Sequence, residues 1–166
     1  MLQTRPARFW AHSRIRQFAA RALFATVLAS AALASAVTTP SADPLSPHSG
    51  KVVLVDFWAS WCAPCRSSFP WMNDMQTKYA DDGLVIVAVN VDNDREAALK
   101  FLDEHPPEFE VHYDADRVLA RRFEVVAMPS SFLLDRDGRI VDRHLGFKVL
   151  QQDEYEAAIR AALGRE

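Results

Sequence analysis

The chain has 166 residues, 49% of them hydrophobic, which is enough apolar material for one sizeable buried core but hardly for two. Its formal net charge at pH 7 is -3, but the first 36 residues hold five arginines and no acid, so the rest carries 14 basic against 22 acidic side chains. This acidic remainder excludes the broad basic surface that binding to nucleic acid requires.

The first predicted element is an N-terminal export signal. Arginines precede an apolar, alanine-rich stretch over 22–37, and Ala34-Ser35-Ala36 has the small-x-small form of a cleavage site. We therefore expect residues 1–36 to be a signal peptide. An uncleaved N-terminal membrane anchor is the alternative, although a stretch of roughly 16 apolar residues is shorter than the ~20 that span a bilayer.

A linker is expected next, followed by the folded domain. Residues 37–50 contain three prolines among small and polar residues, a composition that propagates neither a helix nor a central strand. The domain is expected over 51–166. It opens with the apolar, β-branched run 52–57, which is typical of a strand buried on both faces and indicates a parallel sheet.

The segment that follows the two cysteines predicts a helix lying on this sheet. Its apolar side chains recur at three- and four-residue spacing, and Pro70 should kink it. A second buried strand is expected over 84–91, and Asp92-Asn93-Asp94 can cap the helix after it. The inward residues are Cys65, Phe69, Met72, Met75 and Tyr79 in the first helix and Ala97, Ala98, Phe101 and Leu102 in the second.

The next elements form an insertion or extension of the core over 93–123. After the capped helix, residues 111–113 predict a short strand and residues 114–123 predict another helix. The inward residues of that helix are expected to be Val118, Leu119 and Phe123.

A hairpin and a helix complete the chain. Strands are expected over 130–134 and 139–145, and the Asp-Gly dipeptide between them suits a hairpin turn, so these strands should be antiparallel. A final helix over 152–163 places its apolar residues on one side. Those residues are Tyr155, Ala158, Ile159 and Ala162.

The motif Cys62-Ala63-Pro64-Cys65 carries the chemistry. A strand that delivers Cys62 to the start of a helix places its thiol among unpaired N–H groups at the positive end of the helix dipole, which favours the attacking thiolate. Cys62 is therefore the predicted nucleophile. Attack by Cys62 on a substrate disulfide forms a mixed disulfide between Cys62 and the substrate. Cys65 lies close enough to attack this bond and release the substrate. Pro64 suits the first helical turn and stiffens the loop between the sulfurs.

Alternatives to redox chemistry remain for this pair. The chain has no other cysteine, which excludes a four-cysteine zinc site, and none of its five histidines has paired metal spacing. Copper(I) bound by soft thiolates is the metal alternative, and two inert buried cysteines are another. We expect no metal and no cofactor.

The residues around the motif resemble the thioredoxin superfamily. The stretch 53–66, Val-Leu-Val-Asp-Phe-Trp-Ala-Ser-Trp-Cys-Ala-Pro-Cys-Arg, is similar to the thioredoxin active-site segment. Pro70 matches the kink proline of the family's active-site helix, and Met128-Pro129 matches the cis-proline position. The turn 135–138 and Gly146 match the hairpin and glycine that follow.

This resemblance covers about residues 51–163. With the export signal and the insertion, it is closest to the TlpA/ResA-like branch of bacterial envelope proteins. It implies an α/β, thioredoxin-like fold: a central mixed β-sheet flanked by helices, with a TlpA-type insertion after the second core strand. It also implies a location in the periplasm or on the outer face of the inner membrane.

The resemblance implies roles for individual residues. Pro129 would be cis, and the Met128 backbone beside it would be free to pair with an extended substrate segment. Asp56 occupies the position of the family's buried aspartate, where burial should raise the pKa of the carboxyl so that it can accept the Cys65 proton, through water. The implied catalytic residues are Cys62, Cys65, Asp56 and Pro129, and the implied substrate-docking residues are Trp61, Pro64 and Met128.

Two positions depart from the family's pattern. Relatives that act in cytochrome c maturation often have an acidic residue three positions beyond the second cysteine, where this chain has Ser68. The lysine that general thioredoxins carry on the second core strand is replaced by Ala88. Asp56 would then lack its usual charged neighbour and be harder to ionise.

The resemblance implies an exported protein-disulfide reductase. Its partners would be disulfide-containing client proteins, either apocytochrome c or a copper-site assembly factor, and a membrane electron donor that regenerates the dithiol. A dithiol oxidase or isomerase is one alternative, because small changes of potential reverse the direction. The other is a copper(I)-binding module that uses Cys62, Cys65 and Met128.

Overall fold

The computed structural model describes residues 43–165. Its central strand, β1 (Val52–Trp58), is buried along its whole length. Its apolar, β-branched sequence suits a strand that is covered on both faces. It pairs in parallel with β2 and antiparallel with β4, in a mixed five-stranded sheet of order β3-β2-β1-β4-β5. The strands are β1 (Val52–Trp58), β2 (Leu84–Asn90), β3 (Glu110–Tyr113), β4 (Ser130–Leu134) and β5 (Ile140–Leu145).

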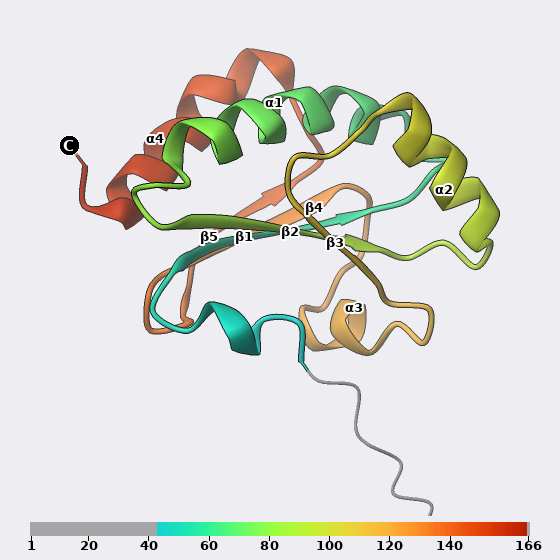
Figure 1. Cartoon of the computed structure of the whole chain (residues 1–166), viewed down its shortest axis with the longest axis horizontal. Helices are drawn as coiled ribbons and strands as arrows, with labels where there is room; N and C mark the ends of the chain where they lie inside the picture. The colour runs from blue at the N-terminus through green and yellow to red at the C-terminus, as the bar shows by residue number, and fades with distance from the viewer. Residues whose placement is uncertain (1–42, 166) are drawn as a thin grey trace, which may run out of the picture. The chain divides into compact units, whose positions relative to one another are not determined.

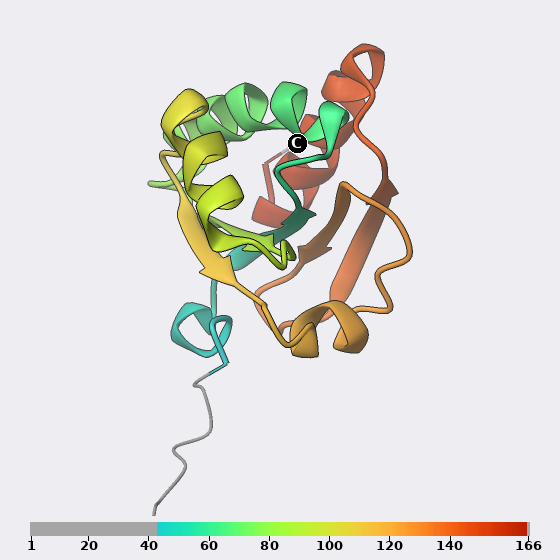
Figure 2. The same cartoon turned by 90° about the vertical axis from the view of Figure 1, so that its right-hand side faces the viewer.

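Helices cover both faces of this sheet. Figure 1 shows α1, α2 and α4 on one face and α3, with the 3-10 turn η1, on the other, and Figure 2 shows the same layers from the side. The helices and 3-10 turns are η1 (Ser46–His48), α1 (Ala63–Tyr79), α2 (Arg95–Glu104), α3 (Val118–Arg122), η2 (Val149–Gln151) and α4 (Gln152–Leu163). The expected order of elements and the mixed sheet are confirmed.

Phe57 and Trp58, the last two residues of β1, pack into the core on opposite faces of the sheet, because successive side chains of a strand point to opposite faces. The Phe57 ring lies 5.5 Å from that of Phe123, on the α3 side. Trp58 points the other way, and its ring lies 5.1 Å from Phe69 of α1 and 4.8 Å from Phe101 of α2. The insertion is thereby packed against the helix that begins at the cysteines.

The helix expected over 114–123 is shorter than predicted, and one of its inward residues was assigned wrongly. Asp114 accepts hydrogen bonds from the backbone N–H groups of Leu119 and Ala120, at 3.1 and 2.8 Å, and Arg117 has a left-handed backbone with φ of 55°. The helix therefore begins only at Val118. Val118 is 59% exposed, whereas Leu119 and Phe123 are buried as expected.

The described part of the expected linker contacts the domain. Leu45 packs against the core, and Arg122 donates a hydrogen bond to Asp43 at 2.5 Å. Pro47 of this segment lies in the first turn of the 3-10 helix η1, where a proline is tolerated. The signal peptide or anchor expected over 1–36 lies outside the described residues. Within residues 43–165, no helix has the length and apolar character needed to cross a bilayer.

The carboxylate of Asp114 should stabilise the insertion. Replacing Asp114 by alanine leaves two backbone N–H groups without their acceptor, so Asp114→Ala is expected to lower the free energy of unfolding by about 2 kcal/mol. The exposed neighbour Asp116 offers a matched control, and Asp116→Ala should cost less than about 0.5 kcal/mol. Urea unfolding followed by fluorescence measures both. Equal losses for the two variants would contradict this role of Asp114.

Candidate active site

A disulfide joins Cys62 and Cys65 at the start of α1. Cys62 is the N-cap residue, the helix begins at Ala63, and the two Cα atoms are 5.4 Å apart. The strand that precedes the pair ends at Trp58, so only three residues connect the sheet to the first sulfur. This is the strand-to-helix placement that the sequence predicted.

The two cysteines differ in exposure. Cys65 is fully buried on the inner face of α1, while Cys62 keeps 3% of its surface accessible beside Trp61, which is 69% exposed. Both cysteines are thus buried, and Cys62 is the one at the helix N-cap, next to the exposed Trp61. The first turn of α1 contains no acidic side chain and no side-chain cap, so its N–H groups are left to stabilise a thiolate at Cys62.

The loop before β4 emerges at the same end of the sheet as the cysteines. Ser130 pairs with Phe57 in the β1–β4 ladder, so Pro129 lies level with Trp58. The Met128–Pro129 peptide bond is cis, as expected, and the Pro129 carbonyl accepts a hydrogen bond from Gly146 at 2.8 Å. The position of Met128-Pro129 beside the end of β1 suits the docking role that the sequence indicated.

Asp56 is a carboxylate in the middle of the core. It is 1% exposed, Ser131 donates a hydrogen bond to its Oδ1 at 2.6 Å, and its Oδ2 has no hydrogen-bond partner. Loss of hydration by burial raises the pKa of Asp56 to about 7, and the Ser131 hydrogen bond opposes this rise. The expected upward shift and its cause agree with the structure.

The two positions that depart from the family's pattern are both buried and uncharged. On β2 the partner of Asp56 in the ladder is Ala88, where general thioredoxins have a lysine, so the strand supplies no positive charge at this level. Ser68 is also buried, and its hydroxyl donates to the Cys65 carbonyl at 3.1 Å instead of presenting an acid. Of the two departures from the family's pattern, Ser68 therefore contacts the redox pair and Ala88 lies beside Asp56.

Two further residues of the site were missed from the sequence. The Ser60 N–H and hydroxyl donate to the carboxylate of Asp92, at 2.8 and 3.1 Å, and the Asn90 amide donates to the same carboxylate at 2.8 Å. The sequence places Asp92 with Asn93 and Asp94 as a possible cap of α2, but in the structure Asp94 is the residue that caps this helix. Because β1 and β2 are parallel, their carboxyl ends meet at one edge, and Asp92 anchors the loop that leads to Cys62.

Other residues near the cysteines belong to the core, except for Pro64. Trp58 is fully buried, and its indole N–H has no hydrogen-bond partner. Phe69 and Met72 are buried core residues, as predicted. Pro64 lies in the first turn of α1 and is exposed beside the disulfide.

Comparison with protein families and curated proteins gives a consistent match. The family model of Redoxin matches residues 26–159. The thiol-disulfide oxidoreductase ResA of Bacillus cereus (strain ZK / E33L) is 33% identical over 105 residues, which are 63% of this chain and 61% of that protein. ResA of Bacillus subtilis (strain 168) is 35% identical over 97 residues, 58% of this chain and 54% of that protein. The chain thus spans about three fifths or less of these two relatives' lengths.

Solved structures show the same fold. The thiol:disulfide interchange protein named DsbE from Chlorobium tepidum is 49% identical, with a TM-score of 0.71 over 72% of this chain and 85% of that one. StoA from Bacillus subtilis, at 22% identity, has a TM-score of 0.60 over 69% of this chain and 86% of that one, and shows the fold alone. The thioredoxin-like fold expected from the sequence is confirmed.

The buried carboxyl makes stability depend on pH. The pKa of Asp56 is raised in the folded state from 3.8 to about 7, so the folded protein binds more protons than the unfolded chain between these values, and stability falls as pH rises through that range. Asp56→Asn should therefore stabilise the oxidised protein at pH 8 by roughly 2–4 kcal/mol, with little difference at pH 4.

Urea unfolding at several pH values measures this difference. The exposed Asp74 on α1 provides the control, and Asp74→Asn should leave the pH dependence of stability as it is in the native protein. A stability gain for Asp56→Asn that is the same at pH 4 and pH 8 would show that ionisation of Asp56 is not its cause.

Proposed function

The chain belongs to the Redoxin family, as a TlpA/ResA-like protein of the thioredoxin superfamily, and from this premise we propose that it reduces disulfides in client proteins of the bacterial envelope. The observation that carries the proposal is the Cys62–Cys65 disulfide at the start of α1, with Cys62 as the N-cap residue. Cys62 lies at a helix N-terminus beside the exposed Trp61, whereas Cys65 lies on the inner face of α1, toward the layer that also holds the Asp56 carboxyl.

The first step uses Cys62. In the dithiol form its thiolate attacks one sulfur of a client disulfide, a new bond joins Cys62 to that sulfur, and the second client sulfur leaves as a thiolate. The open N–H groups of the first turn of α1 stabilise the thiolate before the attack. Of the two cysteines, Cys62 is the one next to the exposed residues Trp61 and Ala63.

The second step uses Cys65 and Asp56. The Cys65 thiol gives its proton to the Asp56 carboxylate, through water, and its sulfur then attacks the sulfur of Cys62. The mixed disulfide breaks, the client leaves as a dithiol, and the Cys62–Cys65 disulfide seen in the structure forms. Two electrons pass from the cysteine pair to the client. A pKa of about 7 allows Asp56 to take up and release this proton near neutral pH.

Client binding is assigned to the surface around the disulfide. Trp61 and Pro64 are exposed beside Cys62, and Met128 precedes the cis peptide bond at the adjacent edge of β4. An extended client segment would lie across these residues and pair with the Met128 backbone. Cys62, Cys65, Asp56 and Pro129 are the proposed catalytic residues.

The proposed setting is the periplasm or the outer face of the inner membrane, reached by the signal or anchor over 1–36. The clients would be apocytochrome c or a copper-site assembly factor, and a membrane dithiol donor would regenerate the reduced pair. The matched relatives are named as thiol-disulfide oxidoreductases or interchange proteins, which supports the reaction class. Ser68, in place of an acid, weakens the narrower cytochrome c assignment.

The equilibrium potential of the Cys62–Cys65 pair tests the direction of electron flow. A reductase that receives electrons from a dedicated donor should have a potential near that of thioredoxin, about -270 mV. Titration against glutathione and then against a stronger dithiol buffer measures it. A value near about -120 mV would show a donor of disulfides and reject the reductase proposal.

Single cysteine variants test the division of labour. Cys65→Ser should attack a peptide disulfide and remain attached to it, because no thiol is left to resolve the intermediate. Cys62→Ser should form at least about tenfold less adduct, because its remaining thiol is buried. Mass spectrometry after acid quenching measures the adducts. Equal trapping by both variants would contradict the assigned roles.

A further inference from the structure

The Asp56 carboxyl is held asymmetrically. Its Oδ1 accepts a 2.6 Å hydrogen bond from the Ser131 hydroxyl, while Oδ2 is buried and has no hydrogen-bond partner. Ser131 is the ladder partner of Asp56 in the antiparallel β1–β4 pair, so the two side chains lie on the same face of the sheet. The contact is therefore set by strand register and not by a flexible loop.

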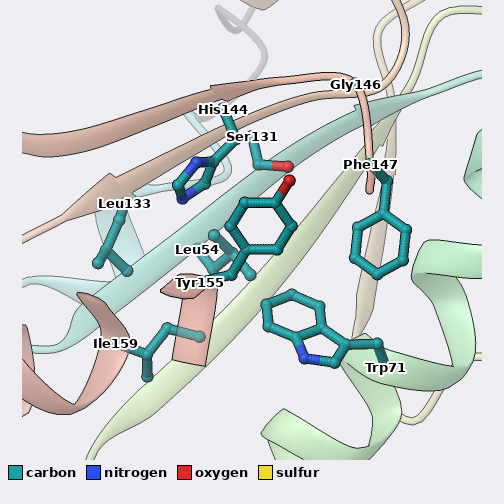
Figure 3. A pocket seen from close by; sticks show the side chains of 9 residues that line it. All are labelled: Leu54, Trp71, Ser131, Leu133, His144, Gly146, Phe147, Tyr155 and Ile159. Carbon is teal, nitrogen blue, oxygen red and sulfur yellow. The ribbon is translucent and has the colours of Figure 1, made fainter. Parts of the chain in front are cut away.

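The layer between the sheet and helices α1 and α4 contains few groups that could replace this contact. Ala88, on the other side of Asp56, has no polar side chain. Next to Ser131 lies a cavity of about 10 Å³, roughly the space of one water, and Figure 3 shows the Ser131 hydroxyl among the residues that line it. The titratable side chains on the elements around this layer are Cys65 and Tyr79 from α1, Tyr155 and Glu156 from α4, and Asp142 and His144 from β5.

His144 has partners of its own. It lies opposite Ser131 in the β4–β5 ladder, but its Nε2 is 3.1 Å from Asp142 and its ring lies 4.3 Å from that of Tyr155. Figure 3 shows the His144 and Tyr155 rings beside each other over the sheet. Ser131 thus supplies the hydrogen bond to Asp56. Because His144 is a titratable neighbour of Ser131, an experiment on Asp56 must separate the effect of Ser131 from that of His144.

We infer that Ser131 is a positioning residue for the resolving step: its hydroxyl fixes Oδ1 of Asp56 and leaves Oδ2 as the atom that receives the Cys65 proton. This inference rests on the proposed function. The proton moves from the Cys65 sulfur to Oδ2, through water, and the electron pair stays on the sulfur for attack on Cys62. Ser131 can donate to Oδ1 in both protonation states, so the carboxyl keeps one orientation throughout.

The same hydrogen bond sets the pH range of the step. A hydrogen bond donated to a carboxylate stabilises the ionised form and lowers the pKa of the carboxyl. Removing the donor therefore raises that pKa. Ser131→Ala should therefore raise the apparent pKa of Asp56 by about one unit, and the resolving rate at pH 7 should fall about fivefold because fewer molecules carry the ionised base. Ser131→Thr keeps the hydroxyl and should restore both values.

The experiment uses the full chain and two independent measurements. The carboxyl carbon-13 chemical shift of Asp56 in the oxidised protein gives its apparent pKa without any client. The resolving rate is then followed from pH 5 to 9 after a mixed disulfide with a small aromatic thiol has formed at Cys62. Circular dichroism and urea unfolding check that each variant is folded.

Two controls isolate the hydroxyl of Ser131. Ser130→Ala removes an adjacent serine on the opposite face of β4, whose hydroxyl donates to the Ala127 carbonyl at 2.6 Å, and should leave the apparent pKa of Asp56 unchanged. Histidine side chains can change charge between pH 5 and 8, so His144→Gln tests whether His144 produces the observed titration. It should leave the carbon-13 titration of Asp56 unchanged.

The outcomes separate this inference from the proposed function. If Ser131→Ala leaves the Asp56 titration and the pH profile as they are in the native protein, the positioning role is wrong although the reductase proposal stands. A profile that moves with His144→Gln would also overturn the role of Ser131. If Asp56→Asn resolves at the native rate across the pH range, Asp56 is not the base, and the second step of the proposed function fails with the inference.

Discussion

The burial of β1 on both faces constrains the rest of the molecule, because every side chain on that strand must be apolar or find its partner inside the protein. Five of its positions satisfy the constraint with fully apolar residues, Trp58 buries an indole N–H without a partner, and Asp56 satisfies it only in part, through Ser131. The cost of keeping a carboxylate there appears as its raised pKa. A group that weakens the fold above neutral pH is thus held where it can exchange a proton with a buried thiol.

The two ends of the active-site segment are fixed by different interactions. Asp92 binds the Ser60 backbone and hydroxyl, which holds the loop between β1 and the first cysteine. Beyond the cysteines, α1 is fixed by Phe69, whose ring contacts Trp58 of β1 and Phe101 of α2. The insertion therefore supports the redox site through the packing of Phe101 against Phe69. The segment that holds the disulfide is thus fixed on both sides by contacts that do not involve the sulfur atoms.

The arrangement also separates the tasks of recognition and resolution. Exposed residues, above all Trp61, surround the sulfur that a client must reach, whereas the resolving sulfur and its proton acceptor lie in the buried layer under α1. Burial gives the acid–base group of the second step a pKa suited to neutral pH. The same burial that makes Asp56 costly for folding therefore makes it useful for chemistry.

The sequence by itself determined the elements and the redox pair, because these depend on local patterns: the continuous apolar run of β1, the helical spacing after Cys65, the Asp-Gly hairpin and the two cysteines at a helix start. Only the tertiary structure decided which polar groups meet. Ser131 contacts Asp56 across 75 positions of sequence, and Asp92 contacts Ser60 across 32. Asp114 likewise shortened α3 and turned Val118 to solvent. Strand register and long-range hydrogen bonds set these contacts, and no local periodicity encodes them.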